Sequence, residues 1–150
     1  MDLDIQRMED HRLLQESLGL IAPVADDVIR AFYDQLFADY PQVRPMFPAV
    51  MDLQRERLLK AIIALVTHYH EPEKLLPALN SMGRRHAGYG VEMEHYGAVG
   101  ATLLATLRRF AGAAWTPGYE QAWTHAYTFA AGAMMQAGEY AEPESGQMAA

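Results

Sequence analysis

Apolar residues recur along nearly the whole chain at the three- and four-residue spacing of an α-helix, and this spacing limits the folds the chain can adopt. A β-strand needs sustained alternation of apolar and polar residues, and no stretch provides it. The pattern therefore predicts an all-α protein. Proline and glycine divide it into one N-terminal helix, four longer helices and two short ones, at about residues 4–20, 23–39, 41–46, 52–69, 75–87, 92–111 and 117–138.

Length and composition favour one globular domain over the 150 residues, with frayed ends at 1–3 and 141–150. The chain has no cysteine, so disulfides and thiolate sites are excluded. Its formal charge of −7 argues against a nucleic-acid partner. No segment looks like a signal peptide or a membrane span, and we expect a soluble, cytoplasmic protein.

The six histidines do not form a zinc-hydrolase signature, because no two of them stand four residues apart with a glutamate between them. His86 is the exception of interest. Leu79 and Met82 precede it at helical spacing, and Gly88 and Gly90 follow it as helix terminators, which predicts a place in the last turn of a short helix. An imidazole there can ligate a metal or a haem iron. It can equally be a histidine that complements the helix dipole.

Tyr33 and Gln54 are two further candidates. Tyr33 lies within a broad apolar helix face, where its hydroxyl needs either a local partner or a wet pocket. Gln54 is expected in the first turn of a helix, where a polar residue is ordinary. Each residue alone is compatible with a purely structural role.

Several residues in fixed order resemble a known family. Phe32-Tyr33 is followed by Tyr40-Pro41 and Phe47, by Gln54, by the Met82–His86 stretch and by Tyr96; Trp123 and Tyr127 in the last helix also fit. Over roughly residues 18–136 the chain is similar to bacterial single-domain globins related to the haem domain of flavohaemoglobins. The resemblance implies a globin fold, a three-over-three helical sandwich around haem b.

The resemblance also implies roles on the ligand side of the haem. Tyr33 and Gln54 match the distal tyrosine and glutamine that donate hydrogen bonds to bound dioxygen. Phe47 matches the phenylalanine that packs on the porphyrin face. Leu58 matches the apolar residue over the distal face.

On the other side, His86 matches the proximal histidine that ligates the iron. Tyr96 matches a tyrosine that, with a glutamate of the last helix, holds this imidazole and makes it more basic. The chain departs from the family here, because the expected glutamate position falls at or next to Tyr140, with Glu139 as the nearest carboxylate.

By resemblance, the expected function is haem-based dioxygen binding with nitric oxide dioxygenation, which converts nitric oxide and dioxygen to nitrate. The chain is too short to hold a flavin- and nicotinamide-binding reductase, so an external electron donor is expected. Two alternatives stay open: dioxygen storage or delivery without turnover, and gas sensing with a separate protein partner.

Overall fold

Prolines and short polar caps define where several helices of the chain begin. Pro41, Pro72 and Pro117 occupy first-turn positions, where the missing N–H of proline costs no helical hydrogen bond. The hydroxyl Oγ1 of Thr116 accepts a hydrogen bond from the N–H of Tyr119 at 3.0 Å and so caps the last helix. The helix predicted over 117–138 begins at this pair.

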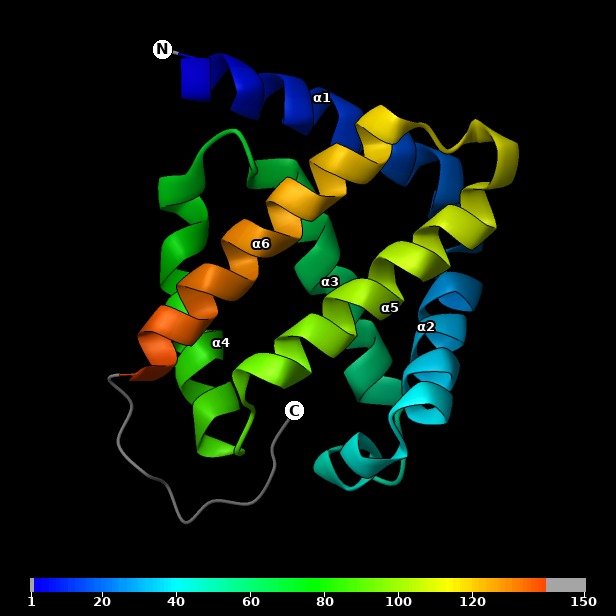
Figure 1. The fold of residues 1–150 in the computed structure, drawn as a ribbon, viewed down its shortest axis with the longest axis vertical. Coiled ribbons are helices and arrows are strands. Elements are labelled where there is room, and N and C mark those ends of the chain that lie inside the picture. The colour runs from blue at the N-terminus through cyan, green and yellow to red at the C-terminus, as the bar shows by residue number, and fades with distance from the viewer. Residues whose placement is uncertain (1, 140–150) are drawn as a thin grey trace.

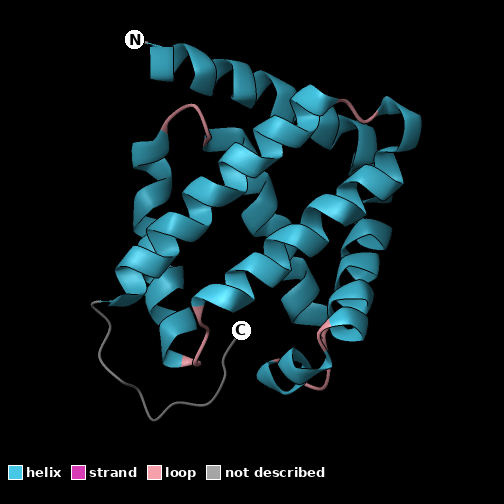
Figure 2. Cartoon of the chain, viewed as in Figure 1, coloured by secondary structure: helices cyan, strands magenta, loops and turns pink. Residues whose placement is uncertain are grey.

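The computed structural model describes residues 2–139, and over this range the chain is helical with no strand (Figure 2). The α-helices are α1 (Asp2–Ile21), α2 (Ala25–Asp39), α3 (Asp52–His68), α4 (Pro72–Gly88), α5 (Met93–Ala111) and α6 (Pro117–Glu139). Three short 3-10 helices join them: η1 (Ala22–Val24), η2 (Pro41–Met46) and η3 (Gly112–Ala114). The all-α prediction is confirmed.

The short helix predicted around His86 is wrong in length, because α4 has 17 residues. It continues through Pro77, whose ring stands on the exposed side of the helix. Leu75 and Leu79 on the opposite face are buried. Packing of that face evidently outweighs the local cost of an interior proline, which is about 3 kcal/mol in an isolated helix.

The helices form two layers. The antiparallel pair α5 and α6 crosses in front of α3 and α4, with α2 at one side and α1 along one end (Figure 1). The helix pairs that pack against each other most extensively are α4–α6, α1–α6 and α2–α5. Trp123 of α6 is the largest fully buried side chain, and its indole Nε1 donates to Oγ of Ser17 in α1 at 2.8 Å. No described helix has the length and apolarity needed to cross a membrane.

Helices α4 and α6 touch backbone to backbone. A Cβ atom added to Gly83 of α4 would lie 2.2 Å from the carbonyl oxygen of Met134 in α6. One turn further on, a Cβ on Gly138 would lie 3.1 Å from the Cβ of Ala87. Glycine at 83 is therefore a requirement of this packing, and the contact sets the position of the helix that carries His86.

Candidate functional site

A cavity of about 320 Å³ lies between α2, η2, α3, α4, α5 and α6. Its size falls in the range of small-molecule and cofactor sites. Among the described residues, no Asp, Glu, Lys or Arg lines it, and most of its wall is aliphatic or aromatic. All the predicted site residues line this one cavity: Tyr33, Phe47, Gln54, Leu58, His86 and Tyr96. The structure thus brings together residues from four separate helices and the segment after η2.

Tyr33 and Gln54 form a hydrogen-bonded pair in the wall built by α2 and α3. The side-chain nitrogen Nε2 of Gln54 donates to the hydroxyl of Tyr33 at 3.1 Å, which leaves the hydroxyl proton of Tyr33 available to another acceptor. Burial raises the pKa of Tyr33 to about 12, so the phenol stays a donor at neutral pH. The amide oxygen Oε1 of Gln54 is buried and has no partner.

Three aromatic rings hold the ring of Tyr33 in place. The centroid of Phe32 lies 4.9 Å away, that of Phe47 5.6 Å away and that of Phe37 5.8 Å away. The Phe32 and Phe47 rings meet Tyr33 edge to face, the arrangement that aromatic quadrupoles prefer. Tyr33 is left 5 % exposed, so its hydroxyl has little freedom to turn towards solvent.

His86 faces the cavity from the last turn of α4. Its Nδ1 lies 2.6 Å from the carbonyl oxygen of Met82, and because a carbonyl only accepts, Nδ1 must carry the proton. The unprotonated Nε2 is then the ring nitrogen that can bind a metal. Burial lowers the pKa of His86, which favours the neutral imidazole over the dipole-complementing cation.

Tyr96 of α5 stacks beside His86. The two ring centroids are 6.3 Å apart, with 25° between the ring planes. In the described part of the chain, the partner of the His86 Nδ1 is the Met82 carbonyl, not a side chain of the last helix. Glu139 is exposed at the end of α6 and does not line the cavity. Tyr140 lies outside the described residues.

Sequence reasoning missed some residues of the cavity wall, of which His95 is the most informative. Its Nδ1 accepts the backbone N–H of Glu92 at 2.8 Å and so caps α5. In the neutral ring the proton is then on Nε2, which makes His95 one of the few hydrogen-bond donors that line the cavity. Its place three residues after the helix cap was the only sequence signal.

The residues that line the cavity fit a large apolar cofactor that contains a metal ion. The cavity offers an extended apolar surface, one half-buried imidazole with a free Nε2, and a buried amide oxygen with no partner among the described residues. A haem needs such a slot, with one neutral histidine for its iron.

A family comparison decides what kind of protein has this arrangement. The Globin family model matches residues 30–134, which is most of the chain and includes every candidate site residue. The chain belongs to the globin family. Membership confirms the predicted globin fold and the predicted haem cofactor.

Individual relatives agree with this globin assignment. A flavohemoprotein of Rhodopirellula baltica is 34% identical over 123 residues, which are 80% of this chain but only 30% of that protein. An engineered carbene transferase from Rhodothermus marinus, described as a candidate nitric oxide dioxygenase, superimposes with a TM-score of 0.78 at 25% identity, covering 87% of this globin and 92% of that chain.

A flavohemoglobin of Malassezia yamatoensis, with bound FAD and haem, superimposes with a TM-score of 0.72 at 21% identity and supports the fold alone. This globin covers 87% of its own length in that match and 36% of the flavohemoglobin. The family match and the flavohemoprotein relative confirm the likeness to the haem domain of flavohaemoglobins, and a bacterial globin of Campylobacter jejuni shares the fold with a TM-score of 0.77 at 24% identity, covering 88% of this chain and 96% of that chain.

Proposed function

We propose that this globin binds haem b through Nε2 of His86, binds dioxygen beside Tyr33 and Gln54, and dioxygenates nitric oxide with electrons from an external reductase. One observation supports the proposal most. The partly buried hydrogen-bonded pair Tyr33–Gln54 and a neutral imidazole line the same cavity, and among the described residues no Asp, Glu, Lys or Arg side chain lines it.

A haem in this cavity supplies a ferrous iron that binds dioxygen and other diatomic gases. With haem bound, Tyr33 would have its hydroxyl proton free to donate to a ligand, and the amide of Gln54 would strengthen this donor by donating to its oxygen. Phe47 and Leu58 supply apolar wall that keeps water away from the ligand. The proton on Nε2 of His95 suits a carboxylate of the haem periphery.

The overall reaction would be NO + O₂ + e⁻ → NO₃⁻. One electron enters from the reductase, and both oxygen atoms of dioxygen end in nitrate. The names of the similar proteins support this choice: one is described as a candidate nitric oxide dioxygenase, and others as flavohemoproteins. The chain spans less than a third of the R. baltica relative's length, so the reductase partner is part of the proposal. The cytoplasmic location and the single domain over residues 1–150 remain predictions from the sequence.

Dioxygen binding without turnover is the second candidate, and the His86–Met82 contact favours it. A carboxylate on Nδ1 would make the imidazole more basic and push electron density towards the iron. The neutral backbone carbonyl that accepts the Nδ1 proton here makes the imidazole less basic than a carboxylate would. Such a pocket is better suited to holding dioxygen than to reducing it.

Visible absorption spectra test the haem assignment first. The ferric, dithionite-reduced and carbon-monoxide-bound forms should show Soret bands that shift between states, and His86→Gly should lose or alter them. His68→Gly, at the end of α3 and outside the cavity, is the matched control and should retain them. Absence of a Soret band after haem is added to the folded protein would refute haem binding.

Turnover then separates the two candidate functions. With a generic ferredoxin or flavodoxin reductase, nitric oxide and dioxygen, the first candidate predicts one nitrate per nitric oxide consumed. The second predicts little catalytic nitrate and a dioxygen complex that oxidises slowly on standing.

A further inference from the structure

The imidazole of His86 lies beside two tyrosine rings that reach it from different parts of the chain. Tyr96 comes from α5, and its ring centroid is 6.3 Å from that of the imidazole, with 25° between the two planes. Tyr89 follows the last turn of α4, and its ring centroid is also 6.3 Å away, with 45° between the planes. Both distances fall within the range over which aromatic rings interact. Both tyrosines line the cavity, so their rings bound the space next to the candidate iron ligand.

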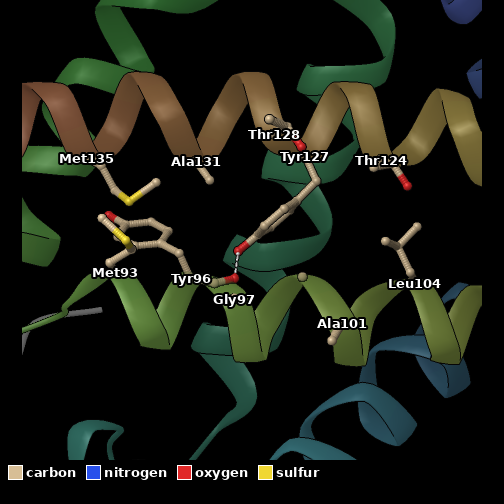
Figure 3. A pocket seen from close by; sticks show the side chains of 11 residues that line it. Met93, Tyr96, Gly97, Ala101, Leu104, Thr124, Tyr127, Thr128, Ala131 and Met135 are labelled. Atoms are coloured by element: carbon tan, nitrogen blue, oxygen red, sulfur yellow. Dashed lines mark hydrogen bonds between the residues drawn. The ribbon is translucent and has the colours of Figure 1, made fainter.

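The ring of Tyr96 is held in place by contacts with α6. The hydroxyl of Tyr127 donates a hydrogen bond to the backbone carbonyl oxygen of Tyr96 at 2.6 Å, which fixes this point of α5 (Figure 3). Figure 3 also shows the side chain of Met135 next to the Tyr96 ring, and both residues line a groove between α5 and α6. The position of Tyr96 therefore depends on the packing of two helices against each other.

The position of Tyr89 depends instead on the turn that ends α4. The backbone carbonyl oxygen of His86 accepts hydrogen bonds from the N–H groups of Tyr89, at 3.1 Å, and of Val91, at 3.0 Å. Gly90 stands between these two residues with a φ of 84°, a conformation that glycine adopts more readily than any other residue. The turn is thus anchored on the backbone of His86, and it places the Tyr89 ring beside the side chain of the same residue.

We propose that Tyr89 is a positioning residue, which fixes the plane of the His86 imidazole and so the orientation in which Nε2 meets a haem iron. The proposal rests on the haem binding through His86 proposed above. The hydrogen bond from Nδ1 to the Met82 carbonyl holds one edge of the ring, but such bonds tolerate a broad range of directions at the carbonyl oxygen. The half-buried Tyr89 ring narrows that range. Groups that orient a metal-ligating histidine contribute to metal affinity without touching the metal.

Truncation of Tyr89 is the first test, with the iron–histidine stretching band in resonance Raman spectra of the ferrous holoprotein as the readout. Tyr89→Ala should shift and broaden this band, because the imidazole then samples several orientations. Tyr89→Phe keeps the ring and should restore the wild-type band. Tyr40→Ala is the matched control, since Tyr40 is also a half-buried tyrosine at the C-terminal end of a helix, α2, but does not line the cavity.

The rate at which ferric haem leaves the protein for an excess of a haem-scavenging protein is the second readout. The loss of one aromatic contact beside the imidazole should make this rate roughly two- to tenfold faster in Tyr89→Ala. The rate should stay at the wild-type value in Tyr89→Phe and in Tyr40→Ala.

Strain in the turn gives a second test that leaves Tyr89 in place. Gly90→Ala puts a side chain at a positive φ without a clash, since a Cβ there meets nothing within 4 Å. The strain should displace the turn and the Tyr89 ring, so the iron–histidine band should shift, by less than in Tyr89→Ala. Gly112→Ala is the matched control, because Gly112 also has a positive φ, 59°, and open space around it, but lies at the C-terminal end of α5 and does not line the cavity.

The outcomes separate the positioning role from haem binding. A wild-type protein without a Soret band overturns both proposals. A haem-bound protein whose iron–histidine band and haem-loss rate are the same in Tyr89→Ala as in Tyr40→Ala overturns the positioning role alone. If Tyr89→Ala does not fold, Gly90→Ala and Gly112→Ala make the same comparison, and identical bands in that pair overturn the role as well.

Discussion

Replacing Tyr33 with phenylalanine isolates one hydrogen bond in the gas pocket. The change removes a single oxygen atom and keeps the ring, so the contacts with Phe32 and Phe47 are retained. The substitution removes the hydroxyl oxygen that accepts a hydrogen bond from Nε2 of Gln54. Dioxygen in the pocket would then lose its phenol donor but none of its apolar surroundings.

The size of the effect follows from burial. Tyr33 is 5 % exposed, so water cannot take the place of the lost donor. A hydrogen bond to a partly charged acceptor in such a site is worth about 1.5–3 kcal/mol. Each 1.4 kcal/mol is about tenfold in a rate, so dioxygen should leave the Tyr33→Phe protein about ten to a hundred times faster.

Stopped-flow displacement of dioxygen by excess carbon monoxide measures this release directly. The carbon monoxide off-rate of the same variant is the internal control, because carbon monoxide carries less charge and depends less on a donor. An unchanged dioxygen off-rate in Tyr33→Phe would refute the role assigned to this hydroxyl.

A second substitution tests whether Gln54 acts through Tyr33. Since Nε2 of Gln54 donates to the Tyr33 hydroxyl, Gln54→Leu should speed release several-fold in the wild type but very little in the Tyr33→Phe background. Equal effects of Gln54→Leu in both backgrounds would mean that the amide contacts the ligand by itself.

Three further predictions concern stability. Gly83→Ala should force α4 away from the Met134 carbonyl, at a cost of about 1–3 kcal/mol; it should lower the Tm and shift the iron–histidine stretching frequency in resonance Raman spectra, whereas Gly132→Ala should do neither. Ser17→Ala should cost about 1–3 kcal/mol in urea unfolding, because it leaves the buried Nε1 of Trp123 without an acceptor. Because burial raises the pKa of Tyr33 to about 12, above the value of about 10 in an unfolded chain, the free energy of unfolding should be unaffected by this group below pH 10 and should fall as the pH rises towards 12. Between pH 10 and pH 12 the free energy of unfolding of Tyr33→Phe should fall by up to roughly 3 kcal/mol less than that of the wild type. Parallel curves of unfolding free energy against pH for the two proteins would contradict the raised pKa of Tyr33.

Local signals were enough to predict most helix positions. Pro41 and Pro117 stand at predicted helix starts that the structure confirms, because the fixed φ of proline acts within its own turn. The length of the helix around His86 depends on tertiary packing, and local signals did not predict it: α4 starts at Pro72, has 17 residues and contains Pro77.

The cavity was predictable only in part. The six site residues that the resemblance implied all line the cavity, and they could be named because each stands at a characteristic interval in an ordered set. His95 carries no such interval, and its place in the cavity wall depends on which helices come to lie opposite each other. The partner of the His86 Nδ1 could not be foreseen either, because a backbone carbonyl leaves no mark in a sequence.

The three rings around Tyr33 have a consequence for the thermodynamics of gas capture. They restrict the side-chain torsions of Tyr33 before any ligand arrives, so the entropy lost in aiming the hydroxyl belongs to folding and not to binding. Phe37, whose ring does not line the cavity, then influences capture from a distance. A smaller residue at that position would leave every polar contact in place, and would still make the pocket bind dioxygen with a larger unfavourable entropy.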